Sequence, residues 1–305
     1  MVSAVKLAVT GGTGFVGSHF IEAALAAGHH VRALTRREQQ ARPRLEWVPG
    51  SLEDADSLRR LVETSDAVVH IAGVINALDP AAFETGNVTG TLAMLAASTA
   101  AGTARFIHVS SLAAREPQLS RYGASKARAE ELVESSGLEW ATVRPPAVYG
   151  PGDKETLELF KMAKLRLVLL PPKGRVSMIH VGDLARLLLT LGEAEQPSRV
   201  TYEPDDGRAG GWSHKELARA LGEAVGRKNL ALSVPGAMLR LGAVVDQLVR
   251  RERAKLSPDR AAYFSHGEWV ARPELQPPPD LWSPQVPTAQ GLAATARWYE
   301  QQGWL

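Results

Sequence analysis

Short apolar runs alternate with longer amphipathic stretches through the first half of the chain, and glycines mark several of the joins between them. Near-continuous apolar strands are typical of a parallel sheet that is covered on both faces, and their alternation with helices is typical of βαβ units. We therefore predict strands at 5–10, 30–35, 45–48, 67–72, 105–110 and 140–144, and helices at 15–27, 57–63, 89–101 and 122–135.

The alternation weakens after Pro151. The expected fold class is α/β, a doubly wound parallel sheet with a smaller C-terminal region. The sheet domain is expected at 1–150, with 176–200 returning to it, and the smaller region at 151–175 and 201–305. In this second half we predict a strand at 176–180, helices at 183–191, 214–225, 235–255 and 288–300, and a proline-rich surface segment at 276–287.

A glycine-rich turn, Thr10–Gly17, lies between the first predicted strand and the first predicted helix. Gly12, Gly14 and Gly17 match the pattern G-x-G-x-x-G, and Gly11, Gly14 and Gly17 match G-x-x-G-x-x-G. Glycine permits a tight turn and lets a pyrophosphate approach the backbone, while the following helix offers free N–H groups to the anion. Because strand, turn and helix are all present, the pattern predicts a dinucleotide site.

The end of the second strand reads Ala-Leu-Thr-Arg-Arg over 33–37 and lacks the acid that usually accepts from the ribose hydroxyls of NAD. A guanidinium at this position pairs with a 2′-phosphate in a bidentate manner. We therefore predict NADP(H) as the cofactor, read by Arg36, rather than NAD. The alternative is a solvated basic loop with NAD bound less selectively.

Tyr122 and Lys126 are four residues apart at the start of a predicted helix, so both lie on one helix face. Ser110 and Ser111 come at the end of the fifth strand, the edge at which parallel sheets build their sites. We expect the ammonium of Lys126 to lower the pKa of the phenol, which is ordinarily about 10. This set predicts hydride transfer, with Tyr122 moving the proton and a serine holding the oxygen. The alternative is that Tyr122 and Lys126 are a surface pair without function.

The composition narrows the remaining classes of function. The chain has 305 residues, a formal net charge of +2 and no cysteine, which excludes disulfides, thiolate catalysis and cysteine-based zinc sites. Scattered basic residues argue against a nucleic-acid partner. We expect no membrane span, a cytoplasmic location, a small-molecule substrate, and a monomer or homodimer. No metal site is predicted, because the histidines lack ligand spacing and are expected to be satisfied structural residues: His29, His30, His70, His108 and His180.

With these motifs, the chain resembles an extended or atypical short-chain dehydrogenase/reductase of the epimerase/dehydratase and dihydroflavonol-reductase-like type. The resemblance covers nearly the whole chain and is most specific up to about residue 190. The segments that carry it are 10–17, 70–73, 87–91, 109–111, 122–126, 144–153, 178–183 and 298–305.

The resemblance implies a Rossmann domain and assigns roles to individual residues. It implies a catalytic triad of Ser111, Tyr122 and Lys126, with Asn87 on the helix that supports it. Lys126 is also expected to contact the nicotinamide ribose. The expected cofactor contacts are Gly11, Thr13, Gly14, Phe15, Val16, Gly17, Arg36, Ala72, Gly73, Tyr122, Lys126, Pro145 and Val148.

Three departures from the family pattern affect the function. Ser111 and Tyr122 are only eleven positions apart, Ser51 stands where an adenine-contacting Asp is usual, and 282–284 match the nucleotide-sugar segment poorly. The favoured function is NADP(H)-dependent reduction or oxidation of a ketone/alcohol pair on a small, rather apolar substrate. The alternatives are a nucleotide-sugar epimerase or dehydratase that recycles its cofactor, and a non-catalytic NADP(H)-bound scaffold or assembly factor.

Overall fold

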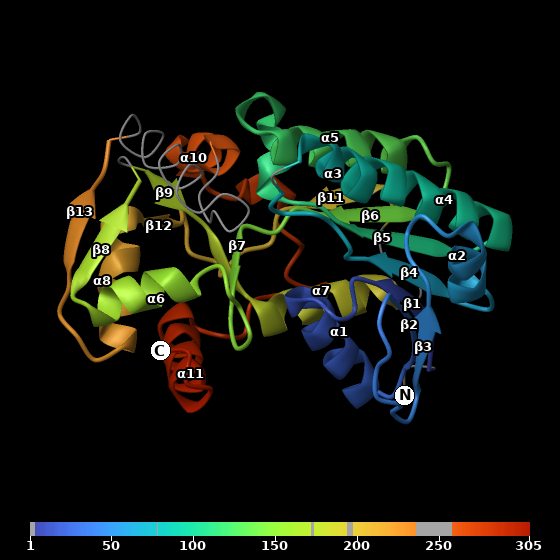
Figure 1. Ribbon diagram of the computed structural model, residues 1–305, viewed down its shortest axis with the longest axis horizontal. Helices are drawn as coiled ribbons and strands as arrows, with labels where there is room; N and C mark the ends of the chain where they lie inside the picture. Colours follow the sequence, from blue (N-terminus) through green and yellow to red (C-terminus); the bar gives the residue numbers. More distant parts are fainter. Residues whose placement is uncertain (1–3, 78, 172–173, 194–197, 236–257) are drawn as a thin grey trace. The chain divides into compact units, whose positions relative to one another are not determined.

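The computed structural model describes residues 4–77, 79–171, 174–193, 198–235 and 258–305 (Figure 1). The chain divides into two compact units. The first contains Met1–Arg144, Leu184–Tyr202 and Pro277–Trp282, and the second contains Pro145–Asp183, Glu203–Gln276 and Ser283–Leu305. The chain leaves the first unit after Arg144, and the domain boundary expected at 150 stays a prediction.

The first unit is built on a parallel sheet of seven strands in the order β11-β6-β5-β4-β1-β2-β3. The order reverses between β1 and β4, and ligands of such sheets bind outside the carboxyl ends at this switch point. The strands are β1 (Lys6–Thr10), β2 (His30–Thr35), β3 (Leu45–Pro49), β4 (Ala67–His70), β5 (Arg105–Val109), β6 (Trp140–Val143) and β11 (Val200–Tyr202).

Helices cover both faces of this sheet, which explains its apolar strands. α1 (Phe15–Ala26) lies on one face, and α4 (Gly90–Ala101) and α5 (Arg121–Glu134) lie on the other (Figure 1). Against the second face, α2 (Ala55–Val62) and α4 enclose a core that includes Leu58, Leu61 and Met94. The doubly wound α/β fold and the strands and helices predicted for the first 144 residues are confirmed to within a few residues.

The described part of the second unit has three small sheets. β7 (Ala147–Tyr149) pairs with β10 (Met178–His180), β8 (Leu167–Leu170) pairs with β13 (Leu230–Ser233), and β9 (Arg175–Val176) lies between β12 (Trp212–Ser213) and β14 (Glu268–Trp269). Its core includes Tyr149, Phe160 and Tyr299, which are fully buried. The helices that contribute residues to this core are α6 (Leu157–Lys164), α8 (His214–Ala224) and α11 (Thr288–Gln301). The second unit also contains α10 (Pro258–Ser265), and α7 (Val181–Gly192) passes from the second unit into the first.

Two predictions for the second half need comment. The strand expected at 176–180 is interrupted at Ser177, because β9 and β10 pair with different partners and the Ser177 hydroxyl donates to Asp205 over 2.6 Å. The helix expected at 235–255 lies almost wholly outside the described residues. The helices expected at 183–191, 214–225 and 288–300 are present as α7, α8 and α11.

Candidate active site

The glycine-rich turn follows β1 and leads directly into α1. Gly11 has a φ of +74°, and the Gly14 N–H donates to the Gly11 carbonyl over 2.9 Å, which closes the turn. A Cβ on Gly11 would lie 2.7 Å from the backbone nitrogen of Ala72, and one on Gly17 would lie 2.1 Å from the Gly11 oxygen. These two glycines are therefore required by the close approach of the protein's own backbone.

Gly14 differs from Gly11 and Gly17 because its surroundings are less crowded. A Cβ there would meet only the Gly11 oxygen, at 3.2 Å, and both Thr13 and Gly14 are exposed. Gly14 is the N-cap of α1, and no side chain forms a capping hydrogen bond with the N–H groups of the first turn, which starts with Phe15 and Val16. A bare helix N-terminus with an unobstructed glycine at the switch point fits the pyrophosphate of a dinucleotide.

A hollow of about 520 Å³ lies beyond the carboxyl ends of β2 and β3. Arg36 and Arg37, both exposed, line it together with Ser51 and Asp54. The Asp54 carboxylate accepts from the backbone N–H groups of Asp56 and Ser57 as the N-cap of α2, so it is already engaged. The side chains here that suit an anion are therefore the two arginines.

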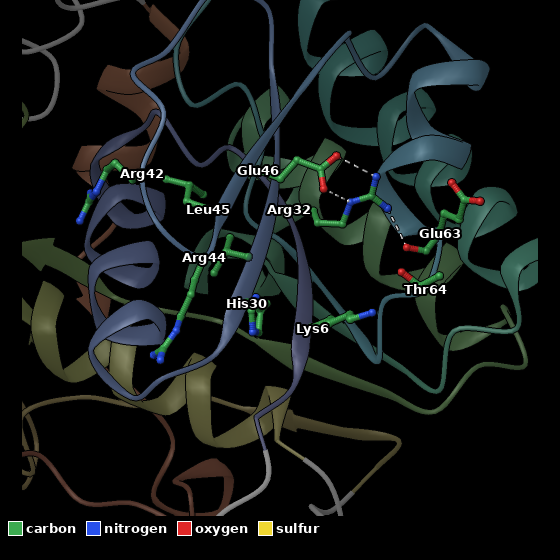
Figure 2. Close-up of a pocket in the computed structure, with 10 residues that line it drawn as sticks. Lys6, His30, Arg32, Arg42, Arg44, Leu45, Glu46, Glu63 and Thr64 are labelled. Carbon is green, nitrogen blue, oxygen red and sulfur yellow. Dashed lines mark hydrogen bonds and ion pairs between the residues drawn. The ribbon is translucent and has the colours of Figure 1, made fainter.

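A second hollow, also about 520 Å³, lies at the amino ends of the same strands (Figure 2). Lys6 and His30 begin β1 and β2 there, and Arg32 forms an ion pair with Glu46 at 3.0 Å and donates to the Glu63 carbonyl at 2.7 Å. Sites of parallel α/β sheets form at the opposite edge. We therefore do not assign the cofactor to this hollow.

Ser111, Tyr122 and Lys126 come together at the carboxyl end of β5. The Ser120 hydroxyl caps α5 by accepting from the Gly123 N–H over 2.9 Å, which places Tyr122 and Lys126 on successive turns. Lys126 is 4% exposed, and its Nζ donates to the Val109 carbonyl over 2.7 Å. The side chains of Tyr122 and Ser111 are hydrogen-bonded. The structure thus brings the three predicted residues into one cluster.

The electrostatics of this cluster differ from the sequence-based expectation. Burial raises the pKa of Tyr122 above its ordinary value, and the hydrogen bond with Ser111 offsets only part of that rise. Burial also lowers the pKa of Lys126 to about 8, against the opposing effect of the Glu130 carboxylate. The expected lowering of the Tyr122 pKa by Lys126 is therefore wrong for this structure: burial is the dominant effect, and the Lys126 ammonium donates to the Val109 carbonyl. Tyr122 is a protonated acid at neutral pH.

Asn87 connects the cofactor edge to the helix that carries the cluster. Its side chain accepts from the Val74 N–H at 2.6 Å and donates to the Val74 carbonyl at 2.9 Å and to the Ser125 hydroxyl at 2.8 Å. Ser125 in turn donates to the Tyr122 carbonyl over 2.8 Å. Asn87 lies on a π-helical turn, Glu84–Thr89, a feature that often marks functional sites. The motif at 87–91 indicated Asn87, but nothing in the sequence indicated Ser125.

Glu130 and Arg144 form a buried ion pair behind Lys126 that the sequence did not reveal. Glu130 is one turn beyond Lys126 on α5, and Arg144 NH2 lies 2.6 Å from its carboxylate; their side chains are 5% and 18% exposed. The carboxylate raises the pKa of Lys126. The spacing of Lys126 and Glu130 was visible, but only the fold brings Arg144 to the same place.

The other expected cofactor residues occupy different parts of the structure. Gly73 follows β4, and a Cβ there would lie 3.6 Å from Lys126 Nζ and 3.1 Å from the Asn87 oxygen. Pro145 and Val148 belong to the second unit, Val148 within β7. Gly73 is thus close to the cluster, and the roles proposed for all of these residues stay predictions.

We expected the buried histidines to have hydrogen-bond partners, and the structure shows this for some of them only. His70 Nδ1 and Nε2 lie 2.8 Å and 3.1 Å from the hydroxyls of Thr10 and Thr91, and burial followed by Lys126 lowers its pKa to about 3. His108 is correctly placed as a buried strand residue, but neither ring nitrogen has a hydrogen-bond partner among the described residues. Within those residues, no three His, Asp or Glu side chains gather in a way that would hold a metal ion.

A doubly wound sheet with an open glycine turn at its switch point, beside a serine, a tyrosine and a lysine, defines a dinucleotide-binding enzyme fold. Residues 7–202 match the model of the NAD dependent epimerase/dehydratase family. The chain belongs to this family, and it is an NAD(P)-dependent oxidoreductase or epimerase of the extended short-chain dehydrogenase/reductase type.

Relatives with reductase names resemble much of the chain. A ceramide reductase of Caulobacter vibrioides is 36% identical over 98% of this chain and 96% of its own length. A 4-hydroxy-2-methyl-3-oxo-4-farnesyl-3,4-dihydroquinoline-1-oxide ketoreductase of Stigmatella aurantiaca is 30% identical over 65% of this chain and 67% of its own. MoeE5 in complex with UDP-glucuronic acid and NAD has the same fold, with a TM-score of 0.76 at 20% identity over 98% of this chain and all of that one.

No described helix is long and apolar enough to cross a membrane.

Proposed function

We propose that this protein is an NADP(H)-dependent reductase that converts a ketone into a secondary alcohol. The observation that carries the proposal is the cluster of Ser111, Tyr122 and Lys126 around a tyrosine that remains protonated. A general acid must hold its proton until the substrate oxygen needs it. A tyrosine whose pKa is at or above its ordinary value holds its proton at neutral pH, so Tyr122 can supply the proton that the carbonyl oxygen takes as its carbon accepts hydride.

The cofactor supplies the hydride when it is bound, and the chain supplies the rest of the chemistry. The Ser111 hydroxyl and the Tyr122 hydroxyl both donate to the carbonyl oxygen, which polarises the C=O bond. As negative charge develops on that oxygen, the proton of Tyr122 passes to it. The buried ammonium of Lys126 stabilises the tyrosinate that is left, which then takes a proton back from water.

The preference for NADP(H) rests on Arg36. It stands at the end of β2, beside a hollow lined by two acids: Asp54, which is engaged as a helix cap, and Glu38, which is exposed. A 2′-phosphate there would find two guanidinium groups, Arg36 and Arg37, whereas the end of β2 itself offers no acid to the ribose hydroxyls of NAD.

The substrate class follows from the relatives. The ceramide reductase matches this chain over nearly its whole length, and the ketoreductase acts on a compound that carries a farnesyl chain by its name. We propose that the substrate is a long-chain lipid ketone of the ceramide type. We also propose a cytoplasmic location, which a chain without cysteine fits.

The proposal is tested by NADPH oxidation with a ketone-bearing ceramide, using Tyr122→Phe as the variant. Loss of the acid should lower kcat by about 10²–10⁴-fold. NADPH binding should persist, because the ring is kept. Tyr202→Phe is the matched control and should keep the wild-type rate, since Tyr202 lies in β11 at the edge of the sheet. Equal rates for Tyr122→Phe and the wild type would refute the assignment.

The cofactor preference needs a separate test. Arg36→Ala should weaken NADPH binding by roughly 1.5–3 kcal/mol, the scale of a hydrogen bond to a charged group, and leave NADH binding nearly unchanged. Arg59→Ala, an exposed arginine on α2 that pairs with Asp56, is the control. A wild type that binds both cofactors equally would contradict the preference. Failure of bound cofactor to exchange during turnover would favour an epimerase or dehydratase.

A further inference from the structure

The two-stranded sheet of β8 and β13 presents leucine on its outer face. The strands are parallel, with Leu167 opposite Leu230 and Leu169 opposite Leu232. The exposed fractions of these four residues are 39%, 60%, 45% and 44%. Leu165, at the turn before β8, is 80% exposed. We call these five residues the leucine face.

The opposite face of this sheet explains why the leucine face is unusual. Val168 and Leu170 alternate with the exposed leucines and are buried against the unit's core, where α6 and α8 cover the sheet (Figure 1). A sheet with one face open to water normally carries polar residues on that face, and parallel strands are normally covered on both. Here the outward positions of the two paired segments, Leu167 and Leu169 in β8 and Leu230 and Leu232 in β13, are all leucine. Such a patch indicates a contact with an apolar partner.

Basic residues border the leucine face. Lys164 and Arg166 flank Leu165, and Arg227 and Lys228 precede β13; all four are exposed. Lys164 lies 3.8 Å from Glu300, and the segments 164–170 and 227–233 contain no acidic residue. Arg166 has a φ of +64°, uncommon for a residue with a side chain, in the turn that leaves Leu165 outermost. The surface therefore combines an apolar centre with a positive border.

We propose that the leucine face docks on an anionic membrane surface. Leucines that enter the headgroup region, with cations beside them, are the features by which proteins bind membranes without crossing them. A second copy of the chain fits less well, because a twofold contact would place the same patch on both sides and bring the two positive borders together. An anionic lipid surface satisfies the leucines and the cations at once.

The inference goes beyond the proposed reductase activity and does not depend on it. If the substrate is a membrane lipid, docking would hold the enzyme at the surface from which the substrate is taken. Membrane binding is measured without substrate or cofactor, so either proposal can fail while the other stands.

The test is flotation of the full-length protein with unilamellar vesicles, one set of phosphatidylcholine and one of phosphatidylcholine with phosphatidylglycerol. The wild type should float with the anionic vesicles and less at high salt, because salt screens the cations. Leu167→Gln/Leu230→Gln should weaken binding by about tenfold or more. Arg227→Gln/Lys228→Gln should weaken it roughly twenty-fivefold, about fivefold for each cation. Leu92→Gln, on α4 and 52% exposed, is the control and should bind as the wild type does.

Three results would overturn the proposal. The first is no flotation of the wild type, or flotation that neither double variant weakens. The second is a dimer in analytical ultracentrifugation that the leucine variant dissociates, which would make a second copy the occupant. The third is a pair of results: the wild type does not bind vesicles, and the melting temperature of the leucine variant falls by several degrees. This would mean that another part of the same chain covers the leucines.

Discussion

Gly14 and Gly17 belong to one motif, but a side chain at each should impair the protein for a different reason. A Cβ at Gly14 would meet only the Gly11 oxygen, at 3.2 Å, whereas one at Gly17 would lie 2.1 Å from that oxygen and 2.7 Å from its carbon. Gly14 also has a φ of −83° and a ψ of 174°, a conformation open to any residue. Gly14→Val should therefore remove the ligand's space, and Gly17→Ala should strain the protein itself.

The expected magnitudes separate the two variants. Two lost hydrogen bonds to a charged phosphate, at roughly 1.5–3 kcal/mol each, would weaken NADPH binding by Gly14→Val at least a hundredfold. Its free energy of unfolding should stay within about 1 kcal/mol of the wild type, because valine also restricts the unfolded chain. Gly17→Ala forces backbone atoms apart, which typically costs about 1–3 kcal/mol and lowers the melting temperature by roughly 2–4 °C per kcal/mol.

Thermal unfolding with and without NADPH measures both effects in one experiment. Saturating NADPH should raise the melting temperature of the wild type, since a ligand that binds only the folded state stabilises it by about 2.7 kcal/mol at a hundredfold excess over Kd. Gly14→Val should unfold at the wild-type temperature and show no such rise, whereas Gly17→Ala should melt early even without ligand. If NADPH still stabilised Gly14→Val, the pyrophosphate would not lie at this turn and the reasoning would be refuted.

Three further outcomes follow from the buried cluster. Because Lys126 loses its proton at about pH 8, kcat/KM for reduction should fall as the pH rises through that value. Glu130→Gln removes a carboxylate that raises the pKa of Lys126, so it should move this fall in the pH–rate profile to lower pH. A fall at the same pH in both proteins would contradict the role of Glu130. The pKa of Lys126 is about 8 in the folded state and 10.5 in the unfolded state, so the unfolded chain binds more protons between these values. The free energy of unfolding should therefore rise between about pH 8 and 10.5 and fall again as the pH is lowered. Lys126→Met should flatten this rise, as measured by urea unfolding at several pH values. Asn87→Ala leaves the N–H and C=O of Val74 without their partners and should cost roughly 2–4 kcal/mol in urea unfolding, against about 1 kcal/mol for Ser125→Ala; equal costs would show that the contacts to Val74 are not important.

Local requirements made much of this fold predictable. The apolar strands of the first 144 residues follow from burial on both faces, and the turn at 10–17 follows from glycine patterns that steric contact imposes over a few residues. Short elements such as β7, β8 and β13 were not predicted, because three or four residues carry little periodicity. Ser177, which interrupts an expected strand, acts through Asp205, a residue that is distant in sequence.

The sequence by itself determined the chemistry that contiguous residues carry: the bare turn with Gly14, the arginine at the end of β2, and the spacing of Tyr122 and Lys126 on one helix face. Only the tertiary structure decided the state of these groups. It withdrew the tyrosine from much of the solvent, which raises its pKa, and it directed Lys126 at the Val109 carbonyl, with the Glu130–Arg144 ion pair one helical turn further on. The physical reason is that a pKa depends on burial and on charges brought from distant segments, and neither is encoded in the spacing of neighbouring residues.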